Sequence, residues 1–194
     1  SVNPQAPDHV EVRAEVLEAP RRYETILDEA ALDRWLEALG RAELFAFATE
    51  TTSLAYTQAE IVGVSFCIEP GVAAYVPLAH DYPGVHDQLP RAQVLAKLKP
   101  LLEDPARGKL GHHLKYDMHV FANHGIRLAG VAHDTLLESY VLESHRSHDM
   151  DSLAWRHLDW KPIAYADVAG KGASQIGFDQ VAVDRATEYS AEDA

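Results

Sequence analysis

The sequence predicts an α/β fold in which a mixed β-sheet is flanked by helices. Three strand-like apolar runs come early and are separated only by short turn-like segments, as in an antiparallel meander. After a first helix, the expected elements follow in the order β-β-β-α-β-α-β-α, which favours helices packed on the faces of a sheet that is antiparallel in its first half. The length of 194 residues matches one domain with a substantial core.

The N-terminal part of the chain predicts an extended lead-in followed by one helix. Residues 1–22 contain three prolines and little periodicity, and only the run VEVRAEV has the pattern of a short edge strand. Asp28 is expected to cap a helix that Gly40 ends. The apolar residues of this helix recur at helical spacing: Leu32, Trp35, Leu36 and Leu39.

The middle of the chain supplies the expected meander and the elements that follow it. The three strands are LFAFAT, EIVGVSFCI and GVAAYVPL. A helix is expected over Arg91–Leu102, and the short run KLGHH then leads to a helix over Tyr116–Asn123 that ends at His124-Gly125. A further strand is expected near Ile126–Ala132.

Aspartates mark the starts of the later helices. Asp134 is a suitable N-cap for TLLESYVLES, and Asp149 or Asp151 for the helix at SLAWRHL. A last helix is expected from about Asp179 to the final AEDA. A ribonuclease-H-like α/β layer is one arrangement that fits this order of elements.

Composition and charge restrict the class of protein. Hydrophobic residues make up 47% and charged residues 24% of the chain, as in ordinary globular proteins, and no stretch approaches the ~18 apolar residues that span a bilayer. The opening segment also lacks an export signal, so we expect a cytoplasmic protein without a membrane partner. The net charge of −13 predicts weak binding to duplex DNA, although clustered carboxylates are what a site for divalent cations requires.

Candidate catalytic groups lie in three separated segments. In FAFATETTSL, position 48 and Glu50 are two residues apart on a strand and therefore project from one face, but position 48 is alanine. In GHHLKYDM, Asp117 lies near the start of a helix. Tyr189 and Asp193 are four residues apart on the last helix and share a face. Taken singly, each acidic residue is more simply interpreted as a solvated surface group or a helix cap.

Other catalytic or cofactor motifs receive little support. His145 and His148 have an H-x-x-H spacing without a CxxC or HExxH companion, so a surface loop is the simpler interpretation. No Walker A, GxGxxG or GxSxG segment is present in the sequence.

The combined order of motifs is far more specific than any one of them. Together TET, LKYD, HDMDSL and YSAED resemble the proofreading 3′-to-5′ exonuclease domain of bacterial DNA polymerase I, the tyrosine subtype of the superfamily named for its Asp-Glu-Asp-Asp ligands. VGVSFCIEPGVAAYVPLAHDY, LKPLLED, HDTLLESYVLES and AGKG are similar too, and the likeness runs from Phe45 to the last residue. The resemblance implies an exonuclease domain over 23–194, within a parent chain that continues into a polymerase domain.

The resemblance also implies roles for individual residues. Glu50, Asp117 and Asp193 would bind metal, with Glu50 also counted as catalytic, and Tyr189 would orient the attacking water. The family's first aspartate falls on Ala48. The residues implied to contact substrate are Thr51, Leu54, Phe178 and His113, the last in place of an expected asparagine. From the residues alone, Leu54 and Phe178 are also compatible with core positions, and Tyr189 with helix packing.

The implied reaction releases nucleoside monophosphates from a single-stranded DNA 3′ end with two Mg²⁺ or Mn²⁺ ions, roughly 3.5–4 Å apart. Alanine at Ala48 has no donor atom, so we expect this chain to be nearly inactive. Because every other motif residue is present, one engineered change explains the pattern better than gradual decay. Two alternatives stay open: a naturally non-catalytic structural or single-strand-binding module, and an RNA exonuclease similar to ribonuclease D.

Overall fold

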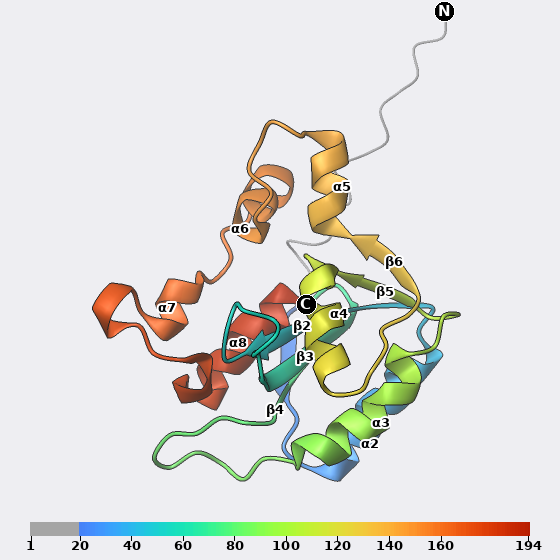
Figure 1. Cartoon of the computed structure of the whole chain (residues 1–194), viewed down its shortest axis with the longest axis vertical. Coiled ribbons are helices and arrows are strands. Elements are labelled where there is room, and N and C mark those ends of the chain that lie inside the picture. The colour runs from blue at the N-terminus through green and yellow to red at the C-terminus, as the bar shows by residue number, and fades with distance from the viewer. Residues whose placement is uncertain (1–19) are drawn as a thin grey trace, which may run out of the picture.

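A six-stranded mixed sheet forms the centre of the molecule in the computed structural model, which describes residues 20–194 (Figure 1). Its strand order is β1-β4-β3-β2-β5-β6. The strands are β1 (Arg22–Thr25), β2 (Leu44–Thr51), β3 (Ile61–Glu69), β4 (Val72–Pro77), β5 (Gly108–Gly111) and β6 (Val131–Asp134). β2, β3 and β4 pair antiparallel, which confirms the predicted meander, whereas β1 pairs parallel to β4, and β5 pairs parallel to both β2 and β6.

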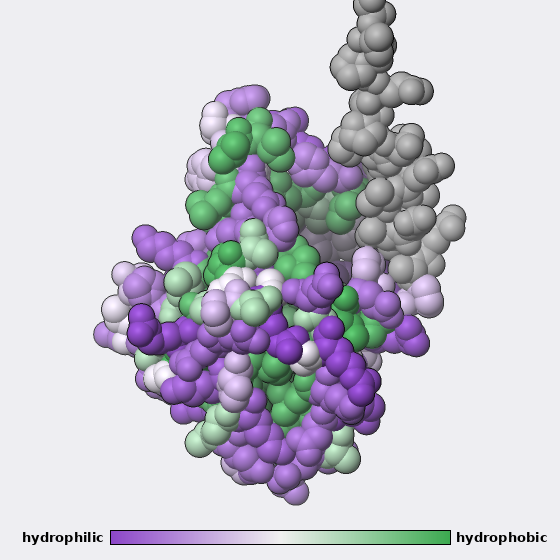
Figure 2. Space-filling view, turned by 90° about the vertical axis from the view of Figure 1, so that its right-hand side faces the viewer, coloured by the Kyte–Doolittle hydropathy of each residue, from purple (hydrophilic) through white to green (hydrophobic). Residues whose placement is uncertain are grey.

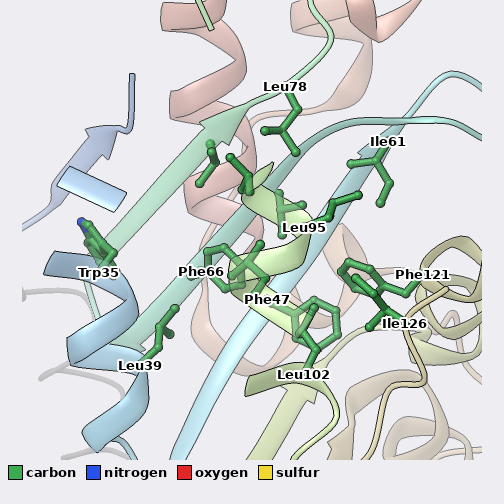
Figure 3. Packing of buried hydrophobic residues seen from close by; sticks show 14 of the residues in the cluster. Trp35, Leu39, Phe47, Ile61, Phe66, Leu78, Leu95, Leu102, Phe121 and Ile126 are labelled. Atoms are coloured by element: carbon green, nitrogen blue, oxygen red, sulfur yellow. The ribbon is translucent and has the colours of Figure 1, made fainter. Parts of the chain in front are cut away.

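Helices cover both faces of the sheet, as the predicted fold class requires. On one face, α2 (Glu29–Arg41), α3 (Arg91–Leu102) and α4 (Leu114–Asn123) pack against the inward side chains of the strands. Figure 3 shows this cluster, in which Trp35 and Leu39 of α2 and Phe121 of α4 surround Phe47 and Phe66 of the sheet. On the other face, α8 (Val183–Asp193) contacts β1 to β4. α8 therefore lies over the half of the sheet that β1, β4, β3 and β2 form.

Gly63 of β3 provides the space that Tyr75 occupies on the α8 side of the sheet. A Cβ atom at Gly63 would lie 2.0 Å from the Tyr75 hydroxyl, and Tyr75 is fully buried. We expect Gly63→Ala to lower the free energy of unfolding by roughly 1–3 kcal/mol or more, because the ring has no room to move. Gly40→Ala is the matched control, since nothing lies within 4 Å of the position that its methyl group would take. Urea denaturation should show the control unchanged or stabilised; equal effects at both sites would contradict this packing.

Three of the predicted helix caps are confirmed. Asp28 accepts a hydrogen bond from the Ala31 amide at 2.8 Å, Asp134 from Leu136 at 3.0 Å, and Asp149 from Ser152 at 2.9 Å. Asp134 begins α5 (Thr135–Leu142), and Asp149 begins α6 (Met150–Leu153), which continues as a π-helical segment over Ala154–Leu158. α7 (Tyr165–Ala169) and the short 3-10 turns Gly172–Ser174 and Phe178–Gln180 then lead to α8.

Some element boundaries differ from the sequence prediction. Gly40 lies inside α2, which ends at Arg41, because the Ala42 amide still bonds to the carbonyls of Ala38 and Leu39. The strand expected near Ile126–Ala132 begins only at Val131; Ile126 and Leu128 are buried loop residues that fill the core.

The last helix also begins later than predicted, because α8 starts at Val183 instead of Asp179. The possible edge strand at VEVRAEV lies outside the described residues, as does most of the predicted lead-in over 1–22.

The described surface is mixed in character. Figure 2 shows apolar side chains among hydrophilic ones at the end of the molecule that carries α5 and α6. The most exposed large apolar side chains of α5 are Leu137, Val141 and Leu142. Within residues 20–194, no helix combines the length and apolarity needed to cross a bilayer.

Candidate active site

The predicted site residues from three separate elements line one cavity of about 180 Å³. β2 contributes Glu50, α4 contributes Asp117, and α8 contributes Tyr189 and Asp193. The other lining residues are Ala48, Thr49, His112, His113, Tyr116 and Met150. In Figure 1 the C-terminal end of α8 lies beside α4, which is how segments far apart in the sequence reach one place.

The end of β2 presents Ala48 and Glu50 to this cavity. The two residues are paired with Ser65 and Gly63 of β3, and the register shifts immediately after Glu50. Their two-residue spacing places both on the α8 side of the sheet, while Phe45 and Phe47 face the opposite core. A side chain introduced at Ala48 would therefore point toward the acidic residues.

Asp117 lies in the first turn of α4, where the positive end of the helix dipole favours a carboxylate. Its Oδ1 accepts a 2.6 Å hydrogen bond from the Thr49 hydroxyl, and the side chain is buried. The helix begins after His113, which has a left-handed backbone (φ 62°) unusual for a residue other than glycine. Asp134 accepts from the amides of both His113 and Leu114, which fixes this turn beside the cavity.

α8 carries three polar side chains toward the cavity. Tyr189 and Asp193 lie one turn apart on the same face of the helix, as their spacing predicts, and the charge of Asp193 contributes to the raised pKa of Tyr189. Ser190 donates a 2.5 Å hydrogen bond from Oγ to Glu50 Oε1, and both groups are buried. This bond ties the helix directly to β2.

The carboxyl groups share a strongly unfavourable electrostatic environment. Burial, followed by the charges of Asp193 and Asp117, raises the pKa of Glu50 to about 8 despite the Ser190 bond. Burial raises the pKa of Asp117 and of Asp193 to about 7 each. Burial and the adjacent carboxylates also raise the pKa of Tyr189 far above its ordinary value, so its phenol is protonated at neutral pH.

A cation would relieve this environment. Among residues 20–194, no Lys or Arg forms an ion pair with Glu50, Asp117 or Asp193. Hard oxygen donors of this kind suit Mg²⁺ or Mn²⁺. The same part of the chain contains no group of three His, Cys, Asp or Glu side chains close enough to hold an ion. The donor chemistry suits a metal, but the set is incomplete: position 48 is alanine, and Asp117 and Glu50 are bonded to the hydroxyls of Thr49 and Ser190.

The residues expected to contact substrate occupy different environments. Thr51 is near the cavity, with its hydroxyl 2.5 Å from Tyr116 Oη. Leu54 is 94% exposed on the loop after β2, so it is available to a ligand and is not a core residue. Phe178 is only 1% exposed and belongs to the core between α8 and the sheet. His113 lines the cavity.

His112 in the lining of the cavity was not predicted, and neither were four other polar or aromatic residues in or beside the site. Ser190 was detectable from its i, i−3 spacing to Asp193. Thr49 was not, since strand alternation places it on the opposite face from Glu50. Tyr116 directly precedes Asp117 in the sequence, and no separate signal marks it as a site residue. Tyr165 of α7 comes from a segment with no expected helix; its ring centroid lies 6.1 Å from Tyr189 and 6.2 Å from Phe178.

The histidine spacing at His145 and His148 has a structural explanation. His148 is buried, and its Nδ1 lies 2.7 Å from the Ser139 hydroxyl, so the expectation of a surface loop is wrong for this residue. Its ring also lies against Tyr140. The segment therefore packs α5 against the residues that precede α6.

Comparison with known proteins agrees with the geometry. Residues 23–194 match a family model described as 3′-5′ exonuclease. DNA polymerase I of Pseudomonas aeruginosa is 55% identical over 181 residues, which cover 92% of this chain and 20% of that protein. The chain thus spans about a fifth of the length of the curated relatives that it matches.

Solved structures share the fold. A structure described as the POL domain of Pol1 from M. smegmatis with DNA primer-template and dNTP superposes with a TM-score of 0.58 and 28% identity, over 72% of this chain and 23% of that one. Escherichia coli RNase D superposes with a TM-score of 0.61 and 19% identity, over 89% and 41% respectively, which shows a common ribonuclease-H-like fold. By its sequence, the chain belongs to the 3′-5′ exonuclease family of bacterial DNA polymerase I.

Proposed function

We propose that residues 23–194 are the proofreading exonuclease domain of a DNA polymerase I-like parent, and that they hydrolyse single-stranded DNA from its 3′ end. The observation that carries the proposal is the meeting of Glu50, Asp117, Asp193 and Tyr189 in one cavity. The family is metal-dependent. Two Mg²⁺ or Mn²⁺ ions would neutralise the charge that develops when an anionic nucleophile attacks a phosphodiester.

The residues that line the cavity would have different roles in this reaction. Glu50, Asp117 and Asp193 would hold the cations, and burial would strengthen that interaction because ionised carboxylates without a cation are unfavourable there. The protonated Tyr189 lines the cavity beside Asp193, and its hydroxyl can donate or accept a hydrogen bond, so it is placed to orient the attacking water. An aspartate at the position of Ala48 would supply a further carboxylate to the ions, and without it we expect the chain to be nearly inactive.

Weak duplex binding is compatible with this function. With a net charge of −13, the domain has little electrostatic attraction for duplex phosphates. A polymerase domain in the same parent would hold the duplex, while the site takes only a few frayed nucleotides through metals and base stacking.

The exposed groups that would receive those nucleotides are Leu54 and Tyr165. Tyr165 is 38% exposed and rests on the buried Phe178, so it is the ring with a free surface beside Tyr189. Tyr165→Ala should weaken binding of a fluorescein-labelled single-stranded oligonucleotide by roughly 1–3 kcal/mol, with little loss of stability. Phe178→Ala should instead lower stability by roughly 3–5 kcal/mol. Anisotropy titrations in which Tyr165→Ala leaves affinity unchanged would contradict this assignment.

The fold shared with RNase D makes an RNA substrate the second candidate. The test is to incubate the Ala48→Asp protein with 5′-labelled single-stranded DNA and RNA of one sequence in Mn²⁺. Proofreading predicts a ladder that shortens from the 3′ end of DNA, with slower action on RNA. Faster RNA degradation would favour the ribonuclease, and no degradation of either would favour a non-catalytic module.

A further inference from the structure

Buried polar groups join the sheet to the start of α8, at the opposite end of this helix from Asp193. The Tyr75 hydroxyl of β4 lies 2.8 Å from His80 Nε2, and His80 Nδ1 lies 2.9 Å from the carbonyl oxygen of Val181. Tyr75 is fully buried and His80 is 4% exposed. The AHDY segment that contains His80 has no role in the proposed chemistry.

The partners of His80 define its tautomer. A backbone carbonyl can only accept, so Nδ1 carries the hydrogen and donates it to Val181. Burial lowers the pKa of His80, with the Val181 bond and the charge of Asp179 opposing, so the ring is neutral at pH 7. Nε2 of the neutral ring then accepts from the Tyr75 hydroxyl.

The loop that carries His80 is itself held in place. The Gln88 side chain bonds to both the amide and the carbonyl of His80, each at 2.8 Å. Two further bonds reach the start of α8 and the segment before it: the Asp81 amide donates to the Asp179 carbonyl at 2.8 Å, and the Val183 amide donates to Tyr82 Oη at 3.0 Å. His80 is therefore a fixed point against which α8 begins.

The other end of this connection reaches the candidate active site. Gly63, over which the Tyr75 hydroxyl lies, is the direct strand partner of Glu50, and the Glu50 charge contributes to a raised pKa of Tyr75. Farther along α8, Ser190 bonds to Glu50. The helix is thus attached to the sheet at two points, one at its start and one beside the cavity.

We propose that His80 is a positioning residue: its imidazole fixes the start of α8 against β4, so that Tyr189 and Asp193 meet Glu50 in the cavity. The consequence for catalysis rests on the proposed function. The consequence for α8 rests on the contacts alone, so the two can be tested separately.

The catalytic test uses the Ala48→Asp protein as its parent. His80→Phe keeps a ring but removes both hydrogen bonds, whereas His80→Asn keeps a donor near the Val181 carbonyl. We expect His80→Phe to lower kcat by roughly 10- to 100-fold with KM little changed, because small misplacements of reacting groups are costly. His80→Asn should recover most of the loss. Leu39→Ala, in the opposite core, is the control for general destabilisation and should leave kcat unchanged at 25 °C.

Equal loss of kcat in His80→Phe and Leu39→Ala, at matched urea midpoints, would overturn the proposal. So would a His80→Asn protein that is as impaired as His80→Phe, since the Val181 bond would then be irrelevant.

The second measurement is amide hydrogen exchange on the chain with Ala48 unchanged. In His80→Phe, the amides of α8 should exchange about tenfold faster, as expected for loss of a buried hydrogen bond, while those of β5 keep their rates. His80→Asn should resemble the parent. An inactive Ala48→Asp protein would refute the proposed function and leave this measurement to decide the role of His80; unchanged α8 exchange in His80→Phe would overturn it.

Discussion

The Ala48→Asp protein is expected to degrade single-stranded DNA at least about 10³-fold faster than the unchanged chain, because a shared metal ligand contributes several kcal/mol of transition-state stabilisation and each 1.36 kcal/mol is a factor of ten. Ala48 lines the cavity with Glu50, Asp117 and Asp193, so a carboxylate there would join the other acidic side chains. Release of mononucleotides from a 3′-labelled oligonucleotide in Mg²⁺ or Mn²⁺ gives the rate.

Two controls make this result specific. Ala48→Asn adds a side chain of nearly the same size without the negative charge, and it should restore little activity. Adding Asp193→Asn to the Ala48→Asp protein should return the rate to background. A restored rate that survives Asp193→Asn, or EDTA, would show that a different site is responsible.

The second large effect is a loss of stability as pH rises in the absence of divalent cations. Glu50, Asp117 and Asp193 have folded-state pKa values of about 8, 7 and 7, above those of the unfolded chain. The folded state therefore binds more protons than the unfolded state across this range, and its stability, complete at low pH, decreases as the carboxyls ionise. Between pH 6.5 and 8.5 we expect a fall of roughly 2–4 kcal/mol in the free energy of unfolding.

Urea denaturation at both pH values measures this slope. Glu50→Gln should remove about half of it, because the largest shift belongs to that residue. Mn²⁺ should also reduce it in the Ala48→Asp protein, since the ion binds the ionised form. A free energy of unfolding that stays constant or rises from pH 6.5 to 8.5 would mean that these carboxyls are not buried together.

The parts of the fold that the sequence predicted correctly depend on local signals. Asp28, Asp134 and Asp149 identify helix starts because a cap bonds within three residues, and the meander follows from apolar runs separated by short turns. β1 was not predicted, since four residues gain a strand only through parallel pairing with distant β4. Ile126 and Leu128 resemble a strand but serve as core contacts in a loop, which periodicity cannot distinguish.

The same division applies to the candidate site. The face shared by Ala48 and Glu50, and that shared by Tyr189 and Asp193, follow from strand and helix periods. The Thr49 bond to Asp117 and the Ser190 bond to Glu50 join residues far apart in sequence, so they appear only once the elements are packed. The packing of α8 against the sheet likewise shows that the Phe178 side chain is buried.

The most direct test of the central claim is anomalous diffraction from crystals of the Ala48→Asp protein grown with Mn²⁺. We expect manganese density inside the cavity, bounded by the carboxylates of Glu50, Asp117 and Asp193 beside the Tyr189 hydroxyl. Saturating Mn²⁺ that leaves this cavity empty, or binds only elsewhere on the molecule, would contradict the account.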